Sequence, residues 1–413
     1  KNVWETYEEQ EMNEVFALAE DYKRFISENK TERAGVKSAV AMAEARGYRD
    51  LREVIRRQET LKPQDKVYLT MMEKSIVLFH LGDRPLEEGM HILGAHIDSP
   101  RLDLKPNPVY EKEDIAYFQT HYYGGIRKYQ WGTVPLSMHG VVMKADGETV
   151  EVSIGEKEGD PQFCVTDLLP HLAAEQNGRK LGEGLKGEEL NIIIGSIPYH
   201  DEENEKIKNP AKLLAMKLLN DRYGITEKDF TRAEIEMVPA YKAVDIGLDR
   251  GLIGSYGQDD RVCAYTALMA EIAAKNPEHT TFTILTDKEE IGSVGNTGLH
   301  SDYVHHAVED LAESFGADTK TVLRHSICLS SDVNAAYDPT FASVYENRNS
   351  SYVNKGCVLT KYTGARGKSG SSDASAETMA KVIGIMEENG AYWQTGELGA
   401  VYAGGGGTFP PFF

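Results

Sequence analysis

The stretch HILGAHIDSPR, residues 91–101, decides the fold class of this chain. Its apolar first half is long enough for a buried strand, and the polar residues and proline that follow predict a loop where the strand ends. A second apolar run lies at residues 75–80, across a turn at residues 82–85. Two buried strands in succession predict the core of a sheet, with His96 and Asp98 at the carboxyl end of the second strand.

Segments farther along the chain alternate between strand and helix patterns. We expect a helix over residues 261–275 and strands at residues 281–286 and 326–330. This alternation is typical of an α/β fold, in which helices cover a mostly parallel sheet. Residues 12–74 are charged, rich in Ala, Leu and Glu, and have helical spacing, so they predict a helical opening.

Residues 103–242 differ in their sequence pattern from the segments on either side. Short strand-like stretches, such as residues 134–142 and 190–195, alternate with turns and with a polar loop. A chain of 413 residues also exceeds the usual size of one domain. We therefore expect a β-rich module, residues 103–242, inserted into an α/β domain made of residues 1–102 and 243–413.

The bulk composition excludes several classes of function. A formal net charge of -20 opposes binding to nucleic-acid phosphates or to an anionic membrane surface. No run approaches the roughly 20 apolar residues of a membrane-spanning helix. The four cysteines are scattered without a CxxC pair, which favours a reducing compartment. We expect a cytoplasmic protein with no nucleic-acid partner and no membrane anchor.

One histidine and several acidic residues follow three of the expected strands or open the expected helix. Such groups come together in α/β sheets because the carboxyl ends of parallel strands share one edge. Taken singly, each has an ordinary interpretation as a turn, a helix cap or a solvated acidic surface. Together they supply the ligands that a pair of Zn2+ or Mn2+ ions requires. The groups are His96 with Asp98, Asp259 with Asp260, Glu289 with Glu290, and Asp332.

Two spacings within these groups indicate separate roles. His96 and Asp98 lie two residues apart in an extended segment, so their side chains lean to the same side and the carboxylate can orient the imidazole. Glu289 and Glu290 are neighbours that point to different sides. One can therefore bind a metal while the other reaches a water molecule as general base.

Four motifs, in this order, resemble those of the metallopeptidase family that contains aspartyl aminopeptidase and vacuolar aminopeptidase I. They are LGAHIDSPR at 93–101, GQDDR at 257–261, DKEEIGS at 287–293 and SSD at 330–332. The resemblance covers nearly the whole chain. It implies a zinc-exopeptidase-like α/β domain, interrupted by an inserted β-rich dimerisation domain, and an aminopeptidase that removes the N-terminal residue of short peptides.

The resemblance also implies how the metals are held. One ion would be bound by His96, Asp259 and Asp332, and Asp259 would bridge to a second ion bound by Glu290. Glu289 would be the general base that deprotonates the water between the two ions. The expected ions are two Zn2+ per subunit, with Mn2+ or Co2+ as alternatives, because carboxylate-rich sites discriminate poorly among them.

Three further residues acquire roles from the same resemblance. Asp98 would orient His96. His171, in DLLPH at 167–171, resembles the segment with which the family's dimerisation domain donates a histidine to the neighbouring subunit's active site. Lys361, in LTKY at 359–362, resembles a lysine on the substrate side. The ordinary interpretations are a half-buried histidine for His171 and a surface charge for Lys361.

The end of the chain departs from the family pattern. The family completes its second metal site with a histidine near the C-terminus, whereas the last histidine here is His325, and Tyr402 stands where members tend to carry an aspartate. The four glycines at 404–407 are not followed by Lys-Ser/Thr, so a phosphate loop is a poor interpretation. We expect a truncated or altered end, because the other ligand positions are kept; the alternative is a degenerate relative with an incomplete second site.

Three functions are consistent with these residues. The first, which we expect, is a metal-dependent aminopeptidase assembled from dimers into the hollow dodecamer of the family. The second is a related metal-dependent carboxypeptidase or deacylase on the same scaffold. It requires a guanidinium clamp for the substrate carboxylate, and we identify none in the sequence. The third is a non-catalytic assembly protein that keeps the oligomeric shell but has lost the catalytic activity.

Overall fold

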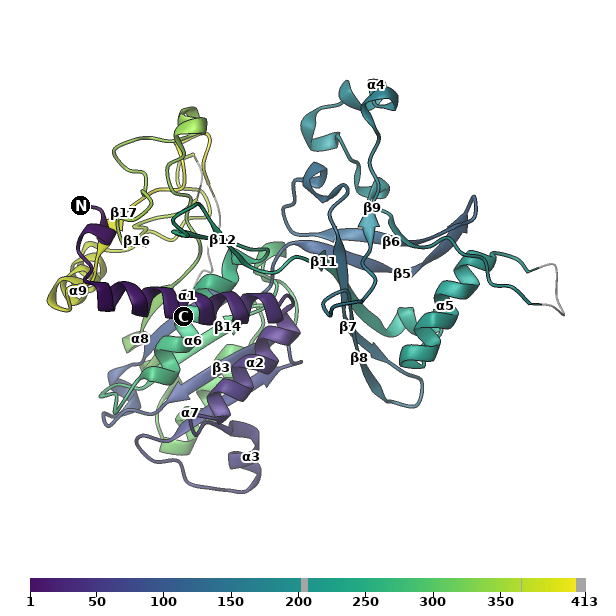
Figure 1. The fold of residues 1–413 in the computed structure, drawn as a ribbon. Coiled ribbons are helices and arrows are strands. Elements are labelled where there is room, and N and C mark those ends of the chain that lie inside the picture. Colours follow the sequence, from purple (N-terminus) through teal and green to yellow (C-terminus); the bar gives the residue numbers. More distant parts are fainter. Residues whose placement is uncertain (202–206, 365, 406–413) are drawn as a thin grey trace.

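The computed structural model describes residues 1–201, 207–364 and 366–405, and it has two lobes (Figure 1). One lobe is built on a six-stranded sheet and the other on a seven-stranded sheet. All strands of the second sheet lie between Arg101 and Pro239, so the chain leaves the first lobe, completes the second sheet and returns.

The six-stranded sheet has the strand order β1-β2-β3-β14-β4-β15. The strand β4 pairs in parallel with both β14 and β15, whereas β3 pairs antiparallel with β2 and β14. The sheet is therefore parallel where the candidate site lies. Its strands are β1 (Arg49–Asp50), β2 (Lys66–Met71), β3 (Ser75–His80), β4 (His91–His96), β14 (Thr281–Thr286) and β15 (Ile327–Ser330).

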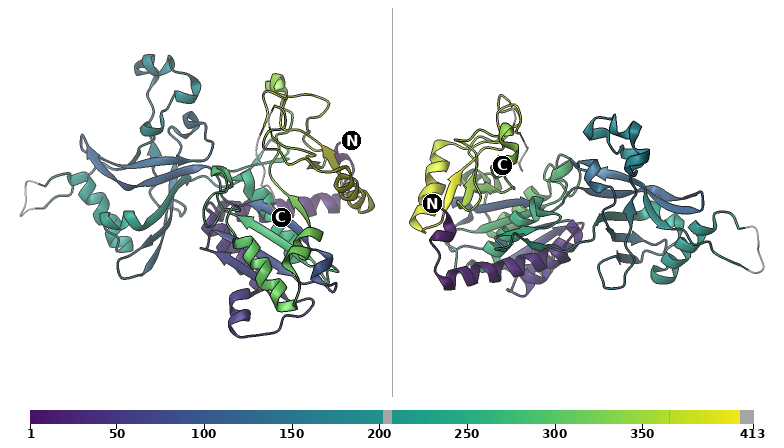
Figure 2. Two further views of the ribbon diagram at one scale, coloured as in Figure 1. Left: turned by 180° about the vertical axis from the view of Figure 1, so that it is seen from behind. Right: turned by 45° about the horizontal axis from the view of Figure 1, so that its top comes forward.

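Helices cover both faces of this sheet (Figures 1 and 2). The helices α2 and α6 pack on one face through small apolar residues such as Ala39 and Ala264. The helices α3, α7 and α8 pack on the opposite face around Phe79 and Phe282, whose rings stack. The helices of this lobe are α1 (Glu9–Glu28), α2 (Glu32–Glu44), α3 (Leu51–Arg56), α6 (Gln258–Ala273), α7 (Tyr303–Phe315), α8 (Thr319–His325) and α9 (Ala376–Glu388).

The seven-stranded sheet has the order β8-β7-β11-β5-β6-β10-β9, and its pairings are antiparallel. Its own apolar core includes Phe118, Leu136 and Met237. The strands are β5 (Arg101–Lys112), β6 (Ile115–Tyr123), β7 (Leu136–Met143), β8 (Thr149–Ile154), β9 (Cys164–Val165), β10 (Ile192–Gly195) and β11 (Ala233–Pro239), accompanied by α4 (Ala174–Asn177) and α5 (Pro210–Tyr223).

Two two-stranded sheets complete the first lobe. The strands β12 (Val244–Ile246) and β13 (Leu252–Gly254) pair antiparallel just after the chain returns from the second sheet. The strands β16 (Cys357–Leu359) and β17 (Trp393–Thr395) pair in parallel on either side of α9 in the sequence. These small sheets lie beside the main sheet on the side of its carboxyl edge (Figure 1).

One expectation about the N-terminal part is wrong. The spacing of residues 12–74 predicts a helical opening, but within this range Lys66–Met71 form the strand β2. In this strand Val67 enters the core on one face of the sheet and Tyr68 enters the core on the other. Neighbouring apolar residues are both buried because helices cover both faces, and a tight turn with positive φ at Met72 and Glu73 then leads directly into β3.

None of the helices in the described ranges combines the length and apolar character needed to cross a membrane. All four cysteines are free thiols. The glycine tetrad is described only as far as Gly405, so Gly406, Gly407 and the chain to Phe413 lie outside the described residues.

Candidate metal centre

Three loops and one helix start meet at the carboxyl edge of the parallel strands. His96, the last residue of β4, lies in register beside Thr286, the last residue of β14. The loop after β14 carries the short 3-10 helix η8 (Glu289–Ile291), and Asp332 lies two residues beyond β15. The helix α6 starts next to Asp259, whose own backbone is not yet helical. Shared strand direction therefore gathers side chains that are far apart in sequence.

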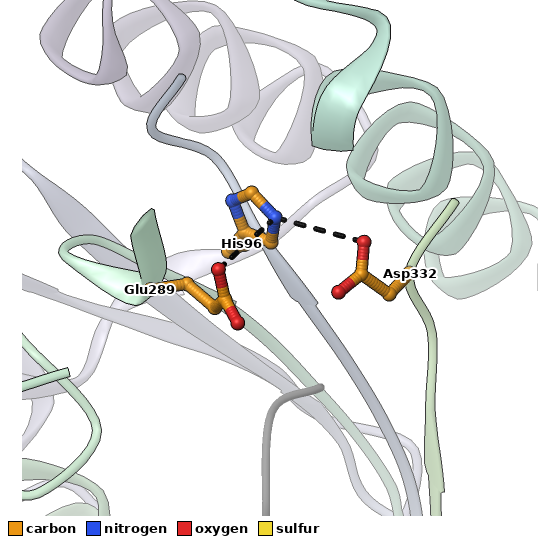
Figure 3. Close-up of side chains that lie close together, drawn as sticks. All are labelled: His96, Glu289 and Asp332. Carbon is orange, nitrogen blue, oxygen red and sulfur yellow. Dashed lines mark ion pairs between the residues drawn. The ribbon is translucent and has the colours of Figure 1, made fainter. Parts of the chain in front are cut away.

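The imidazole of His96 is the centre of this cluster, with 1% of the residue exposed. Its Nε2 atom lies 3.1 Å from Asp259 Oδ1, 3.7 Å from Glu289 Oε2 and 3.8 Å from Asp332 Oδ1. Figure 3 shows Glu289 and Asp332 pointing at this atom from different segments of the chain. The free edge of the imidazole thus faces carboxylates from three separate segments.

Asp98 is fully buried behind His96. The Nδ1 atom of His96 lies 3.0 Å from the backbone oxygen of Asp98 and 3.2 Å from its Oδ1. Both are acceptors, so Nδ1 carries a proton, and Nε2 is the nitrogen that offers a lone pair to a metal ion when the ring is neutral. The backbone N–H groups of Glu289 and Glu290 each donate to the Asp98 carboxylate at 3.2 Å. Asp98 therefore positions both the histidine and the two glutamates.

The donor set fits a pair of divalent metal ions. Within each of three overlapping groups, the potential ligand atoms lie within 4.8 Å of one another. One imidazole with several carboxylates suits Zn2+ or Mn2+, and groups that share members suit two ions bridged by a carboxylate. The groups are His96 with Glu289 and Asp332, His96 with Asp259 and Glu290, and Asp259 with Asp260 and Asp332.

These groups do not by themselves separate the expected roles. The residues expected at the first ion, His96, Asp259 and Asp332, are distributed over all three groups, and Glu289 occupies a ligand-like place between His96 and Asp332. Glu290 lies with His96 and Asp259, as expected for a residue at the second ion. The assignment of Glu289 as general base and Glu290 as metal ligand therefore stays a prediction.

Burial and mutual repulsion raise the pKa values of the two glutamates at this centre. Burial, with repulsion from Asp332, Asp98 and Asp259, raises the pKa of Glu289 to about 7. Burial and the neighbouring Asp259 raise the pKa of Glu290 to about 8. Burial lowers the pKa of His96, but hydrogen bonds to Asp259 and other acids outweigh it and raise that pKa well above its usual value. A metal-free centre therefore holds protons near neutral pH that a bound cation would displace.

Two residues gain a place at the centre that the sequence does not assign to them. Asp260, expected in the same candidate group as Asp259 but without a role of its own, is fully buried and joins Asp259 and Asp332 in the third group. Burial raises its pKa to about 8. Tyr123, from the second sheet, donates its hydroxyl to Asp98 Oδ2 at 2.7 Å. Nothing in the local sequence of Tyr123 signals this contact, because it joins two lobes.

Lys361 lies beside the centre, in the wall of a cavity of about 720 Å³ that also includes Asp259 and Asp332. Its Nζ donates to Asp373 Oδ1 at 2.6 Å and to the backbone oxygen of Ala374 at 2.9 Å. The exposed lysine thus faces the cavity next to the centre, with its charge partly matched by Asp373.

The structure does not bring His171 to this centre. It lies exposed in the 3-10 helix η4 (Pro170–Leu172) of the second lobe. The arm that carries it, next to α4, stands out from the second sheet and is separated from the first lobe in each view (Figures 1 and 2). Any role of His171 in catalysis therefore requires another subunit.

A buried imidazole and converging carboxylates at the carboxyl edge of an α/β sheet define a metal-dependent hydrolase. A family profile described as aminopeptidase I zinc metalloprotease (M18) matches residues 25–413. This chain belongs to that family, the M18 peptidases, as its four motifs predict.

Relatives in this family are similar to the chain over nearly its whole length. A probable M18 family aminopeptidase 1 of Clostridium acetobutylicum is 50% identical over 413 residues, covering 99% of this chain and 88% of that protein. The crystal structure of an M18 family aminopeptidase from Thermotoga maritima is 43% identical with a TM-score of 0.92, covering 99% and 88%. Yeast mApe1, 20% identical with a TM-score of 0.70 over 92% and 85%, shares the fold.

The predicted fold class and activity are therefore confirmed. The chain is a metallo-aminopeptidase with a metal cofactor, in a mixed α/β fold. The comparisons give no support to the alternative of a carboxypeptidase or deacylase, or to that of a non-catalytic assembly protein.

Proposed function

We propose that this aminopeptidase uses two divalent ions held between His96 and the surrounding carboxylates. Zn2+ is the expected ion, and Mn2+ and Co2+ are the alternatives. The observation that supports this is that His96 belongs to two overlapping groups of ligand atoms, each completed by acids from other segments. We assign His96 and Asp332 to the first ion, Glu290 to the second and Asp259 to both. Bound there, such ions polarise a carbonyl group and lower the pKa of a water molecule.

The chain's own residues carry the proton transfers of the proposed reaction. Glu289 accepts the proton of the attacking water and passes it to the amine that leaves. Asp98 keeps the proton of His96 on Nδ1, so that Nε2 is free to act as a ligand. The α-amino group and side chain of the N-terminal residue occupy the cavity beside Asp259 and Asp332, with Lys361 on the substrate side.

We further propose that residues 103–242 form a dimerisation domain, and that His171 stabilises the transition state in the neighbouring subunit. Exposed apolar side chains flank His171: Leu168 is 49%, Leu169 52% and Leu172 66% exposed. A partner that covered these leucines would remove them from water and would immobilise the histidine between them.

The proposed assembly is a homo-oligomer built from such dimers, reaching a dodecamer that admits short peptides. The yeast relative mApe1 has been solved as a dodecamer. The chain's four free thiols suit a reducing compartment, and we propose the cytoplasm as its location.

Metal analysis beside peptide hydrolysis tests the proposal. Protein stripped by a chelator should be inactive, and Zn2+ should restore hydrolysis of leucyl or aspartyl anilides as occupancy rises to two ions per subunit. The matched substrate is the same anilide with an acetylated N-terminus, which should not be cleaved. Full activity at one ion per subunit, or equal cleavage of the acetylated substrate, would overturn the assignment.

The same reconstitution has an expected pH dependence. Metal binds the ionised carboxylate of Glu290, whose pKa is about 8 in the metal-free centre, and the negative charge of ionised Glu289, whose pKa is about 7, attracts the cation. Both groups are mostly protonated at pH 6 and increasingly ionised by pH 8. The apparent affinity for Zn2+ should therefore rise with pH, by about tenfold or more between pH 6 and pH 8.

His171→Ala tests the contribution across subunits. We expect kcat to fall by about 100-fold or more, the cost of losing one donor to a transition state, with metal content and oligomer mass unchanged. Light scattering measures the mass. His200→Ala, which removes another exposed histidine of the same lobe, is the control. An unchanged kcat in His171→Ala would remove this residue from the site.

A further inference from the structure

The second sheet reaches the metal centre through the last residue of β6. The hydroxyl of Tyr123 donates to Asp98 Oδ2 at 2.7 Å, and Tyr123 is 8% exposed. The other oxygen of that carboxylate lies 3.2 Å from His96 Nδ1. A single carboxylate therefore joins a tyrosine of one lobe to the histidine at the centre of the other lobe's site.

The ring of Tyr123 is itself held in place by a buried ion cluster. Arg101 lies opposite Tyr123 in the pairing of β5 with β6, and its guanidinium carbon is 3.7 Å from the ring centroid. The guanidinium is bound by Asp103 at 2.8 Å, by Glu32 at 3.3 Å and by Glu236 at 3.4 Å. Glu32 comes from α2 of the first lobe and Glu236 from β11 of the second, so the cluster fixes the tyrosine relative to both lobes.

The backbone next to Tyr123 also abuts the site. Gly124 has φ of +75°, and a Cβ atom built on it would lie 3.2 Å from Glu290 Cβ and 3.4 Å from Pro100 Cβ. The end of β6 thus packs directly against Glu290. Its Tyr123 binds Asp98, the carboxylate that also accepts from the backbone N–H groups of both glutamates.

We propose that Tyr123 is a positioning residue for the metal centre. Asp98 accepts at both oxygens: one side receives His96 Nδ1 and the N–H of Glu289, and the other receives Tyr123 and the N–H of Glu290. The tyrosine hydroxyl fixes the rotation of the carboxylate and thereby the direction of His96 Nε2. The second lobe is in this way part of the active site of its own subunit, in addition to any role between subunits.

This inference rests on the proposed role of His96 as a metal ligand, and the test keeps the two apart. Tyr123→Phe removes one hydroxyl and keeps the ring that covers Arg101. Residues that orient a ligand typically contribute 10–100-fold to metal affinity or activity. We expect a chelator to strip Zn2+ from Tyr123→Phe about tenfold faster than from wild type. The visible absorption of the Co2+-loaded variant should change, and kcat should fall more than KM rises.

Tyr122→Phe is the matched control, because its exposed ring precedes Tyr123 on the same strand. It should match wild type in metal release, Co2+ spectrum and kcat. His96→Ala is the second arm and should lose metal outright. If His96→Ala binds metal as wild type does, the proposed metal centre fails.

If His96→Ala loses metal while Tyr123→Phe matches wild type in metal release and Co2+ spectrum, only the role of Tyr123 fails. A purely structural tyrosine would lower the unfolding temperature of the metal-free protein and leave the Co2+ spectrum unchanged, which would also overturn the proposal.

Discussion

Glu289→Gln should abolish nearly all turnover while the protein keeps its metal. An amide has the size and shape of the carboxylate but no basic site, so it cannot accept the proton of the attacking water. Loss of a general base typically costs about 100- to 10,000-fold in rate. We expect a fall of this size in kcat, with KM changed far less, measured by steady-state hydrolysis of an aminoacyl anilide beside metal analysis of the same sample.

The comparison with Glu290→Gln makes this result decisive. Both glutamates belong to groups that include His96, and both have a raised pKa. Glu290→Gln should lose metal, whereas Glu289→Gln should keep it. The reverse outcome would exchange the two roles. Glu278→Gln is the control for the loss of one negative charge, because Glu278 is an exposed acid just before β14, the strand that leads to both glutamates.

Three strands of the six-stranded sheet are predictable from the sequence because each is a short run rich in apolar or β-branched residues. The runs at 75–80 and 281–286 coincide with Ser75–His80 and Thr281–Thr286, and the run at 326–330 begins one residue before Ile327–Ser330. The strand Lys66–Met71 is missed because it follows a long charged stretch whose helical spacing extends the predicted helical opening to residue 74.

The candidate site is predictable as a set of residues but not as a set of distances. His96, Asp259, Glu289, Glu290 and Asp332 follow strand ends or open a helix, and the rule that such ends share an edge brings them together. Their spacing alone does not assign them to two ions, because Glu289 and Glu290 both lie in groups that include His96; that assignment comes from the family resemblance.

Contacts between the lobes cannot be read from the sequence either. Tyr123 reaches Asp98 only because the end of β6 returns to the first lobe, and the position of β6 is set by its pairing with β5 and by the buried Arg101 cluster. A local pattern carries no information about which residue of a distant strand will face a given loop. The same holds for Asp260, whose burial depends on how α6 packs against β4.

Asp259→Asn should weaken metal binding at both proposed positions of the centre. Asp259 belongs to two of the three ligand groups, and its Oδ1 lies 3.1 Å from His96 Nε2. The amide keeps the shape of the side chain but removes the charge that a bridging ligand supplies. We expect affinity for Zn2+ to fall by more than about 100-fold, which exceeds the roughly 10–100-fold cost of losing a residue that only supports a ligand. Occupancy should drop below one ion per subunit, with kcat falling in parallel.

Thermal unfolding separates this loss of metal from a loss of fold. The metal-free Asp259→Asn protein should unfold within a few degrees of metal-free wild type, because the side chain is 54% exposed and lies among other carboxylates. Wild type should gain about 2.7 kcal/mol of stability per bound ion when free Zn2+ is 100-fold above Kd, and the variant should gain almost none at that concentration. Asp249→Asn, in the exposed β12–β13 turn, should behave as wild type. A variant that still gains the full stabilisation would show that Asp259 is not a shared ligand.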